Sequence, residues 1–186
     1  MNRLAPYLFA ASILGLCWLA MMGVHELGHV AAGLATGGTV EKVVLHPLAI
    51  SRTDVSPNPS PLIVVWSGPL VGVLLPLLAW LAIPARLAWG KGITQFFAGF
   101  CLIANGSYIG LGSLAHIGDC GEMLRHGSPI WSLWLFGAIT LPTGFWLWHR
   151  LGELGQLFQP NMVSLKGAII SLICLTVITS VMLCLT

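Results

Sequence analysis

Charged side chains are the residues that this sequence has least of. Lysine, arginine, aspartate and glutamate together make up 8% of its 186 residues, against roughly 25% in soluble domains. The net charge of +2 is small and spread along the chain, which argues against nucleic acid as a partner. Hydrophobic residues reach 56%, and the mean hydropathy is +0.89. The composition therefore predicts an integral, multi-pass membrane protein.

The sequence also lacks the marks of a disulfide framework, a repeat protein or a low-complexity linker. Its five cysteines are an odd number and form no C-x-x-C pair. Four of them lie in apolar stretches, where a free cysteine behaves as a small hydrophobic residue. No internal repeat is visible, and the length suits one unit. We expect residues 1–186 to form a single membrane-embedded domain.

Long apolar runs are abundant instead. They predict five transmembrane helices, at about residues 6–36, 61–83, 93–116, 130–149 and 165–185. β-branched residues that partly alternate after the first run predict a small hairpin or a pair of edge strands, at about 39–45 and 49–53. Residues 150–166 are amphipathic and are expected to lie at the membrane interface. The predicted fold class is an all-α integral membrane protein with this small β element.

An H-E-x-x-H pattern, His25-Glu26-Leu27-Gly28-His29, interrupts the first apolar run near its end. On a helix His25 and His29 share a face, so both imidazoles can bind one metal ion, and Glu26 lies close enough to serve a metal-bound water. Chance alone can produce a pattern with three fixed positions. However, a central Asp, Lys or Arg costs about 2.5–3.5 kcal/mol to insert into a bilayer. Three clustered titratable groups therefore predict a compensating metal ion.

The third metal ligand is less determined. A catalytic zinc site takes three protein ligands and keeps one position for water. Asp119, a short carboxylate beside flexible glycines, is the favoured residue, and His116, Cys120 and Glu122 remain alternatives. Asp119 has a structural alternative too, as the cap of a short helix at 120–126. With five spans, the loops after the first and third helices share one side of the membrane, so Asp119 can reach the histidine pair.

With these residues the sequence resembles the site-2 protease family of intramembrane zinc metalloproteases. The likeness rests on the H-E-x-x-H pattern in the first core helix, on Ser67-Gly68-Pro69 in the second, and on Asn105 followed by Asp119 in and after the third. The motifs cover about residues 20–125. The resemblance implies a family core at about residues 6–125, which includes the whole first helix, and additional helices at about 130–185.

The chain departs from the family pattern at three places. Gly72 stands where the family often has asparagine, and Cys120 separates Asp119 from Gly121. No proline lies between Asn105 and Asp119. The missing proline affects the local backbone geometry that positions Asp119, the favoured third ligand.

The resemblance implies a zinc metalloendopeptidase that hydrolyses a peptide bond in or near a transmembrane segment of a membrane-protein substrate. His25, His29 and Asp119 would bind Zn²⁺, and Glu26 would activate the zinc-bound water. Asn105 would contact the substrate or the developing oxyanion. The strand edge at 39–53 would pair with the locally unwound substrate. The expected surroundings are the lipid bilayer of a bacterial-type cell membrane.

Two other functions fit part of the pattern. A membrane scaffold or chaperone would keep the metal site without catalysis, but it would not need Glu26. A small ion transporter would spread ionisable residues over several helices, often with inverted repeats, and neither feature is visible.

Membrane orientation stays open. With the N-terminus inside, five lysines and arginines lie inside and three outside. That count places the site toward the outside. The resemblance implies the opposite, a site that opens to the cytosol.

Overall fold

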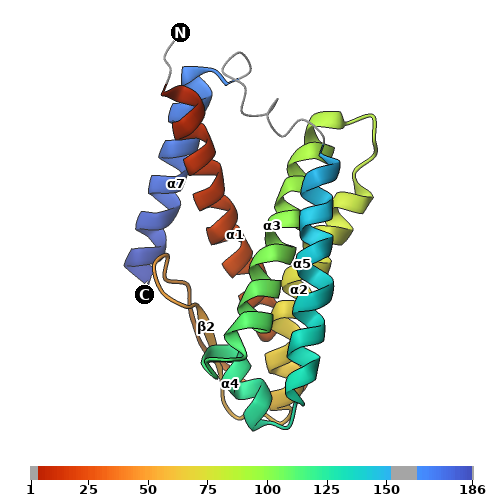
Figure 1. Cartoon of the computed structure of the whole chain (residues 1–186). Coiled ribbons are helices and arrows are strands. Elements are labelled where there is room, and N and C mark those ends of the chain that lie inside the picture. The colour runs from red at the N-terminus through yellow and green to blue at the C-terminus, as the bar shows by residue number, and fades with distance from the viewer. Residues whose placement is uncertain (1–3, 152–162, 186) are drawn as a thin grey trace.

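The computed structural model describes residues 4–151 and 163–185. Within them the chain forms six helices and one antiparallel pair of strands (Figure 1). The elements in chain order are α1 (Ala5–Ala35), β1 (Val40–Val44), β2 (Arg52–Val55), α2 (Pro61–Ala82), α3 (Ala88–Gly112), α4 (Gly118–Arg125), α5 (Ile130–Arg150) and α7 (Leu165–Leu185). The predicted helical fold with a small hairpin is confirmed in this part of the chain.

Four of these helices, α1, α2, α5 and α7, are long and apolar enough to cross a membrane. The fifth predicted span, α3, has 25 residues but is less apolar. It packs between α2 and α5, so much of its surface faces protein. Side chains that face protein can be less hydrophobic than side chains that face lipid. Four of the five predicted spans are therefore long and apolar enough to cross a membrane.

The helices form two groups that meet at one end (Figure 1). α1 and α7 lie side by side, and α2, α3 and α5 form the second group. α1 packs closely on α2 but contacts α3 only over a short stretch. The hairpin and α4 lie at the end of the bundle where α1 finishes. This end therefore gathers the C-terminal third of α1, the two strands and the short helix.

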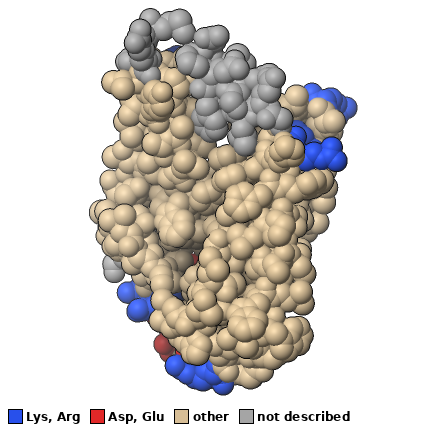
Figure 2. Space-filling model, in the orientation of Figure 1, with Lys and Arg blue, Asp and Glu red and all other residues tan. Residues whose placement is uncertain are grey.

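Charged residues lie mainly at the two ends of the bundle. On the face shown in Figure 2, lysine and arginine side chains occupy the ends and leave the middle free of them. Such a band is what the hydrocarbon layer of a membrane requires. The described lysines and arginines are Lys42, Arg52 and Arg125 at the end with the hairpin, and Arg86, Lys91, Arg150 and Lys166 at the other.

α1 and α2 cross with their backbones in contact. A Cβ atom added to Gly28 would lie 2.8 Å from the carbonyl carbon of Ser67 and 2.9 Å from the Cα of Gly68. The Ser67 hydroxyl donates a hydrogen bond to the Gly28 carbonyl oxygen, at 2.9 Å. Small residues permit this approach, as they commonly do between membrane helices. The crossing presses the H-E-x-x-H turn of α1 against α2.

Several predicted boundaries are wrong by a few residues. α3 begins at Ala88 rather than 93 and ends at Gly112 rather than 116. The second strand is β2, three residues later than predicted, because the chain from 45 to 51 forms a loop instead. Asp119 lies in the first turn of α4 and is not its cap, which is Ile117. Most of the predicted interfacial segment, residues 152–162, lies outside the described residues.

Candidate metal centre

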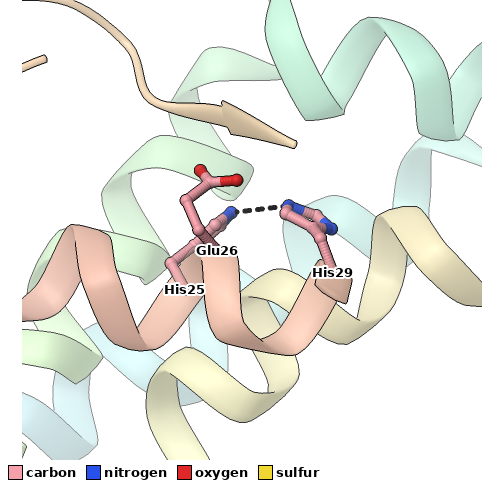
Figure 3. A group of neighbouring side chains, drawn as sticks. All are labelled: His25, Glu26 and His29. Carbon is pink, nitrogen blue, oxygen red and sulfur yellow. Dashed lines mark hydrogen bonds between the residues drawn. The ribbon is translucent and has the colours of Figure 1, made fainter. Parts of the chain in front are cut away.

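The two histidines of the motif lie one turn apart on the buried face of α1. Their Nε2 atoms are 3.1 Å from each other (Figure 3). Both side chains are buried, with exposed fractions of 6% for His25 and 5% for His29. The helical period places the two rings on one face, and the crossing with α2 closes that face off from the surroundings. The sequence prediction of a shared histidine face is therefore met by the geometry.

Hydrogen bonds at the other ring nitrogens determine the tautomer of both histidines. His29 Nδ1 lies 2.8 Å from the Val64 carbonyl oxygen, which only accepts, so this nitrogen is the donor. His25 Nδ1 lies 2.7 Å from Asn105 Oδ1. The Asn105 amide nitrogen donates to the Cys101 carbonyl oxygen at 2.9 Å, which orients the amide oxygen toward His25. In the neutral imidazoles both Nε2 atoms therefore present lone pairs, the arrangement typical of metal-binding histidines.

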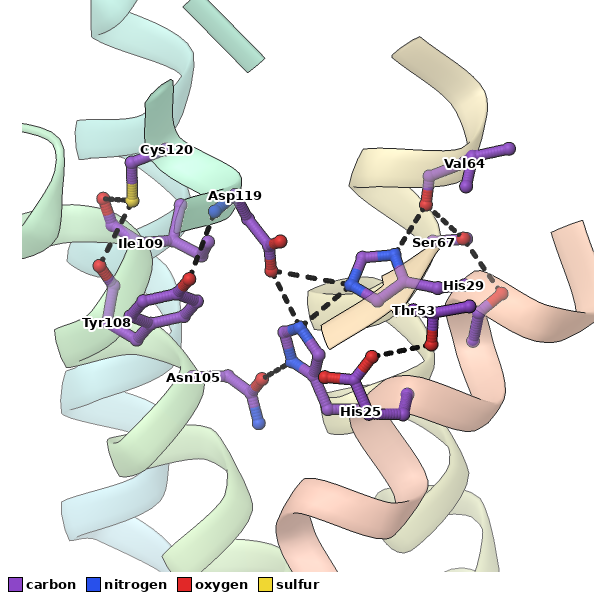
Figure 4. Close-up of polar contacts among 12 residues, drawn as sticks. His25, His29, Thr53, Val64, Ser67, Asn105, Tyr108, Ile109, Asp119 and Cys120 are labelled. Carbon is purple, nitrogen blue, oxygen red and sulfur yellow. Dashed lines mark hydrogen bonds and ion pairs between the residues drawn. The ribbon is translucent and has the colours of Figure 1, made fainter. Parts of the chain in front are cut away.

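Asp119 completes the cluster from α4. Its Oδ2 atom lies 2.7 Å from His25 Nε2 and 3.4 Å from His29 Nε2 (Figure 4). Two lone-pair nitrogens and a carboxylate oxygen thus converge with no hydrogen between them, so the cluster requires a cation, either a metal ion or a proton. Tetrahedral zinc with bonds of about 2.0–2.2 Å separates its ligands by roughly 3.3 Å. The separations of 3.1 and 3.4 Å that involve His29 are close to that value, and the 2.7 Å between His25 and Asp119 is shorter.

The space beside the two Nε2 atoms is kept open by a glycine. A Cβ atom added to Gly68 of α2 would lie 2.7 Å from His25 Nε2 and would collide with the His29 ring. One turn later, a Cβ atom on Gly72 would lie 2.8 Å from Asn105 Oδ1. The departure from the family pattern at position 72 therefore makes room for the asparagine that holds His25. The donor set and the open space both fit a zinc ion.

Glu26 lies beside the histidines and is held by the hairpin. Its side chain is 2% exposed, and its Oε2 atom accepts a hydrogen bond from the Thr53 hydroxyl of β2 at 2.7 Å (Figure 4). Ligand atoms of His25, Glu26 and His29 lie within 4.8 Å of one another. Glu26 is thus near enough to act on a water molecule at the metal or to bind the metal itself.

The electrostatics of Asp119 favour the ionised carboxylate. Burial alone would raise the pKa of this group, but with protons on the facing nitrogens of His25 and His29 the hydrogen bonds donated to Asp119 outweigh burial and hold its pKa well below the usual range. The carboxylate is therefore present in the form that binds a metal.

The cysteine next to Asp119 is turned away from the cluster. Cys120 Sγ donates to the carbonyl oxygen of Tyr108 at 3.3 Å and lies 3.7 Å from that of Ile109. Burial, followed by the charge of Asp119, raises the pKa of the Cys120 thiol to about 11. Because its Sγ atom faces the α3 backbone rather than the histidine pair, Cys120 instead attaches α4 to α3.

The other two alternatives for the third ligand lie near the surface. Glu122, 45% exposed at its side chain, pairs with Arg125 and lies 3.4 Å from His126 Nε2. His116 is exposed in the turn before α4 and has a positive φ of 55°. Of the four candidates from the sequence, Asp119 is the one whose side chain the structure brings to the histidine pair.

Three contacts of the centre come from residues that the sequence did not single out for it. Thr53 holds Glu26, and the Val64 carbonyl holds His29. The Tyr108 hydroxyl accepts a hydrogen bond from the Asp119 backbone N–H at 3.0 Å. Gly118 permits this contact, because its φ is +56° and a side chain at that position would strike the Tyr108 hydroxyl. The predicted contact of Asn105 with substrate stays a prediction.

No family model, no curated protein and no solved structure matches this chain. The likeness to the site-2 protease family therefore stays a prediction from the motifs.

Proposed function

We propose that this protein is an intramembrane zinc metalloprotease. The observation that carries the proposal is the convergence of His25 Nε2, His29 Nε2 and Asp119 Oδ2 within 2.7–3.4 Å of one another. The Glu26 carboxylate lies beside this cluster, buried and oriented by Thr53. Three protein ligands, a neighbouring carboxylate and space kept by Gly68 are the elements of a catalytic zinc site.

The proposal includes five membrane crossings, with α3 as the fifth. His29 and His25 lie 6 and 10 residues before the end of α1, or about 9 and 15 Å along the helix axis. The hairpin and α4, which carry charged residues, mark that end of the bundle. The proposal therefore has the metal centre inside the membrane, near one of its surfaces.

The chemistry divides among a few residues of the chain. A zinc ion in such a site polarises a carbonyl group and lowers the pKa of water toward about 7. Glu26 accepts the proton of the attacking water and returns it to the leaving amine nitrogen. Asn105 and the Val64 carbonyl keep the two imidazoles in the tautomer that directs Nε2 to the centre. Thr53 keeps one carboxylate oxygen of Glu26 engaged, which leaves the other oxygen for the proton.

A membrane scaffold or chaperone with a structural metal site is the second candidate. It is favoured by the short distance between Glu26 and the histidines, because a carboxylate within 4.8 Å of both nitrogens can serve as a fourth ligand. Structural zinc sites have four protein ligands and no position for water. Activity and metal content together separate the two candidates.

Removal of the metal tests the proposal most directly. The purified protein in lipid vesicles is expected to contain about one zinc ion per chain and to cleave a test substrate that has one transmembrane helix. A zinc chelator should abolish cleavage, and added Zn²⁺ should restore it. Mg²⁺ should not, because it prefers oxygen ligands in an octahedral arrangement. Cleavage that continues after complete removal of zinc would rule out the metalloprotease.

The hydrogen bond from Thr53 to Glu26 gives a second expectation. In Thr53→Val the strand keeps its β-branched residue, but the buried carboxylate loses its donor, a loss of about 1–3 kcal/mol. We expect kcat to fall by about tenfold to a hundredfold, with KM and zinc content unchanged. Thr53→Ser, which keeps the hydroxyl, should retain most of the activity. Equal losses in both variants would show that Thr53 acts only through the packing of the strand.

A further inference from the structure

The metal centre opens into a cavity of about 410 Å³ between α1, α3 and the loop that joins β1 to β2. Figure 2 shows a hollow in the middle of this face, with acidic atoms visible inside it. The volume lies within the range of about 300–1,000 Å³ that is usual for ligand sites. Glu26, His25 and Asp119 line the cavity together with residues that have no part in the metal centre.

The wall along α1 is apolar and continuous with the metal centre. Met22, Met21 and Trp18 lie three, four and seven residues before His25, so they share its face of the helix. Seven residues of helix span about 10 Å. The cavity therefore runs from the metal centre along α1 toward the middle of the helix. Three residues of an extended chain cover about the same distance.

The opposite wall and the cover are also apolar. Ala104 of α3 lies beside Asn105 in the wall, and the loop residues Leu48 and Ile50 form part of the cover. The Trp18 indole N–H donates a hydrogen bond to the Pro47 carbonyl oxygen at 3.2 Å, which ties this loop to α1.

Among the described residues, charged groups occupy only the metal end of this cavity. Of the lysine, arginine, aspartate and glutamate residues in the described chain, only Glu26 and Asp119 line it. A charged side chain placed among Trp18, Met21 and Met22 would have no partner, at a cost of about 2.5–3.5 kcal/mol or more in such surroundings. Thioether and indole groups instead make favourable contacts with large apolar side chains.

We propose that this cavity binds two or three consecutive apolar residues on one side of the scissile bond, with a large side chain against Ala104. The inference rests on the proposed function, because the metal end is where the cleaved bond would lie. The substrate class is thus an extended apolar segment that has leucine, methionine or phenylalanine beside the cleaved bond. The wall residues select the substrate, and the metal centre cleaves it.

The size of residue 104 provides one test. Wild type is compared on test substrates with phenylalanine, leucine, alanine or aspartate beside the cleaved bond. We expect kcat/KM to favour phenylalanine and leucine over alanine by about tenfold or more and aspartate not to be cleaved. Ala104→Leu should reduce the preference for phenylalanine over alanine by a similar factor. Ala88→Leu, an exposed position at the other end of α3, is the matched control and should leave the preference unchanged.

A binding test without catalysis separates this inference from the proposed function. Ala104→Cys is combined with Glu26→Gln, and alkylation at position 104 by N-ethylmaleimide is followed by mass spectrometry. A peptide with three central leucines should slow alkylation about tenfold, and the same peptide with a central aspartate should not. The inference would be overturned if both peptides slowed alkylation equally or if neither slowed it. It would also be overturned if the kcat/KM of the wild type did not depend on the size of the substrate side chain. If the variant shows selective slowing but the wild-type protein cleaves none of the test substrates, the inference is kept and the protease is rejected.

Discussion

Replacement of Glu26 by glutamine is expected to reduce cleavage of a transmembrane substrate by about 10²–10⁴-fold or more, the contribution typical of general acid–base catalysis. Glutamine keeps the size of the side chain and still accepts the hydrogen bond from the Thr53 hydroxyl. It cannot take a proton from water. Zinc content should remain near one ion per chain, because His25, His29 and Asp119 are unchanged. Cleavage rate and metal content are measured on the same preparation.

The outcomes of this experiment decide between enzyme and scaffold. Glu41→Gln, an exposed position on β1, is the matched control and should behave as wild type in both measurements. A Glu26→Gln protein that cleaves as fast as wild type would exclude Glu26 as the base and with it the proposed mechanism. Loss of zinc together with activity would identify Glu26 as a fourth ligand, and the scaffold with a closed metal site would then be the better account.

The second large effect is expected at Asp119. Asp119→Ala removes one of the three proposed ligands and leaves two imidazoles. Changes in residues that only support ligands typically cost 10–100-fold in metal affinity, so loss of the ligand itself should lower zinc affinity by more than about 100-fold. His25→Ala and His29→Ala should do the same. Zinc affinity is measured by competition with a chelator of known strength.

Two neighbours of Asp119 on α4 serve as controls. Glu122→Ala changes a surface ion pair with Arg125, and Cys120→Ala changes a buried thiol that faces the α3 backbone. Neither should alter zinc affinity more than about twofold, because neither side chain points to the histidines. Full zinc binding in Asp119→Ala, with loss in either control, would show that the third ligand was assigned wrongly.

Local signals in the sequence were sufficient for the helices that have apolar runs with clear ends. α2 begins at Pro61, where the prediction began it, because proline suits the first turn of a helix. α1 ends before Gly37, whose φ of 82° is favourable for glycine. The boundaries of α3 were less accurate, since its glycines and polar residues blur the hydrophobic pattern at both ends.

The candidate metal centre was predictable as far as the helical spacing of the two histidines and the side of the membrane shared with Asp119, but not in its supporting contacts. The pair His25 and His29 follows from the helical period. The hydrogen bond between Asn105 and His25 joins residues 80 positions apart in the sequence. No local sequence pattern specifies which side chain a buried asparagine contacts. Thr53 likewise reaches Glu26 only because β2 begins at Arg52. A shift of one residue in a strand exchanges its two faces, so the contact could not be read from composition.

The short contact between α1 and α3 gives the metal centre a mechanical consequence. Two of the proposed ligands belong to α1, and the third is carried by α4, which Cys120 and Tyr108 attach to α3. A metal ion bound between them would hold α1 and α3 together at the end of the cavity. A ligand present at 1,000 times its dissociation constant stabilises a folded protein by about 4 kcal/mol. The width of the substrate cavity and the lifetime of the folded protein would then both depend on the free zinc concentration around it.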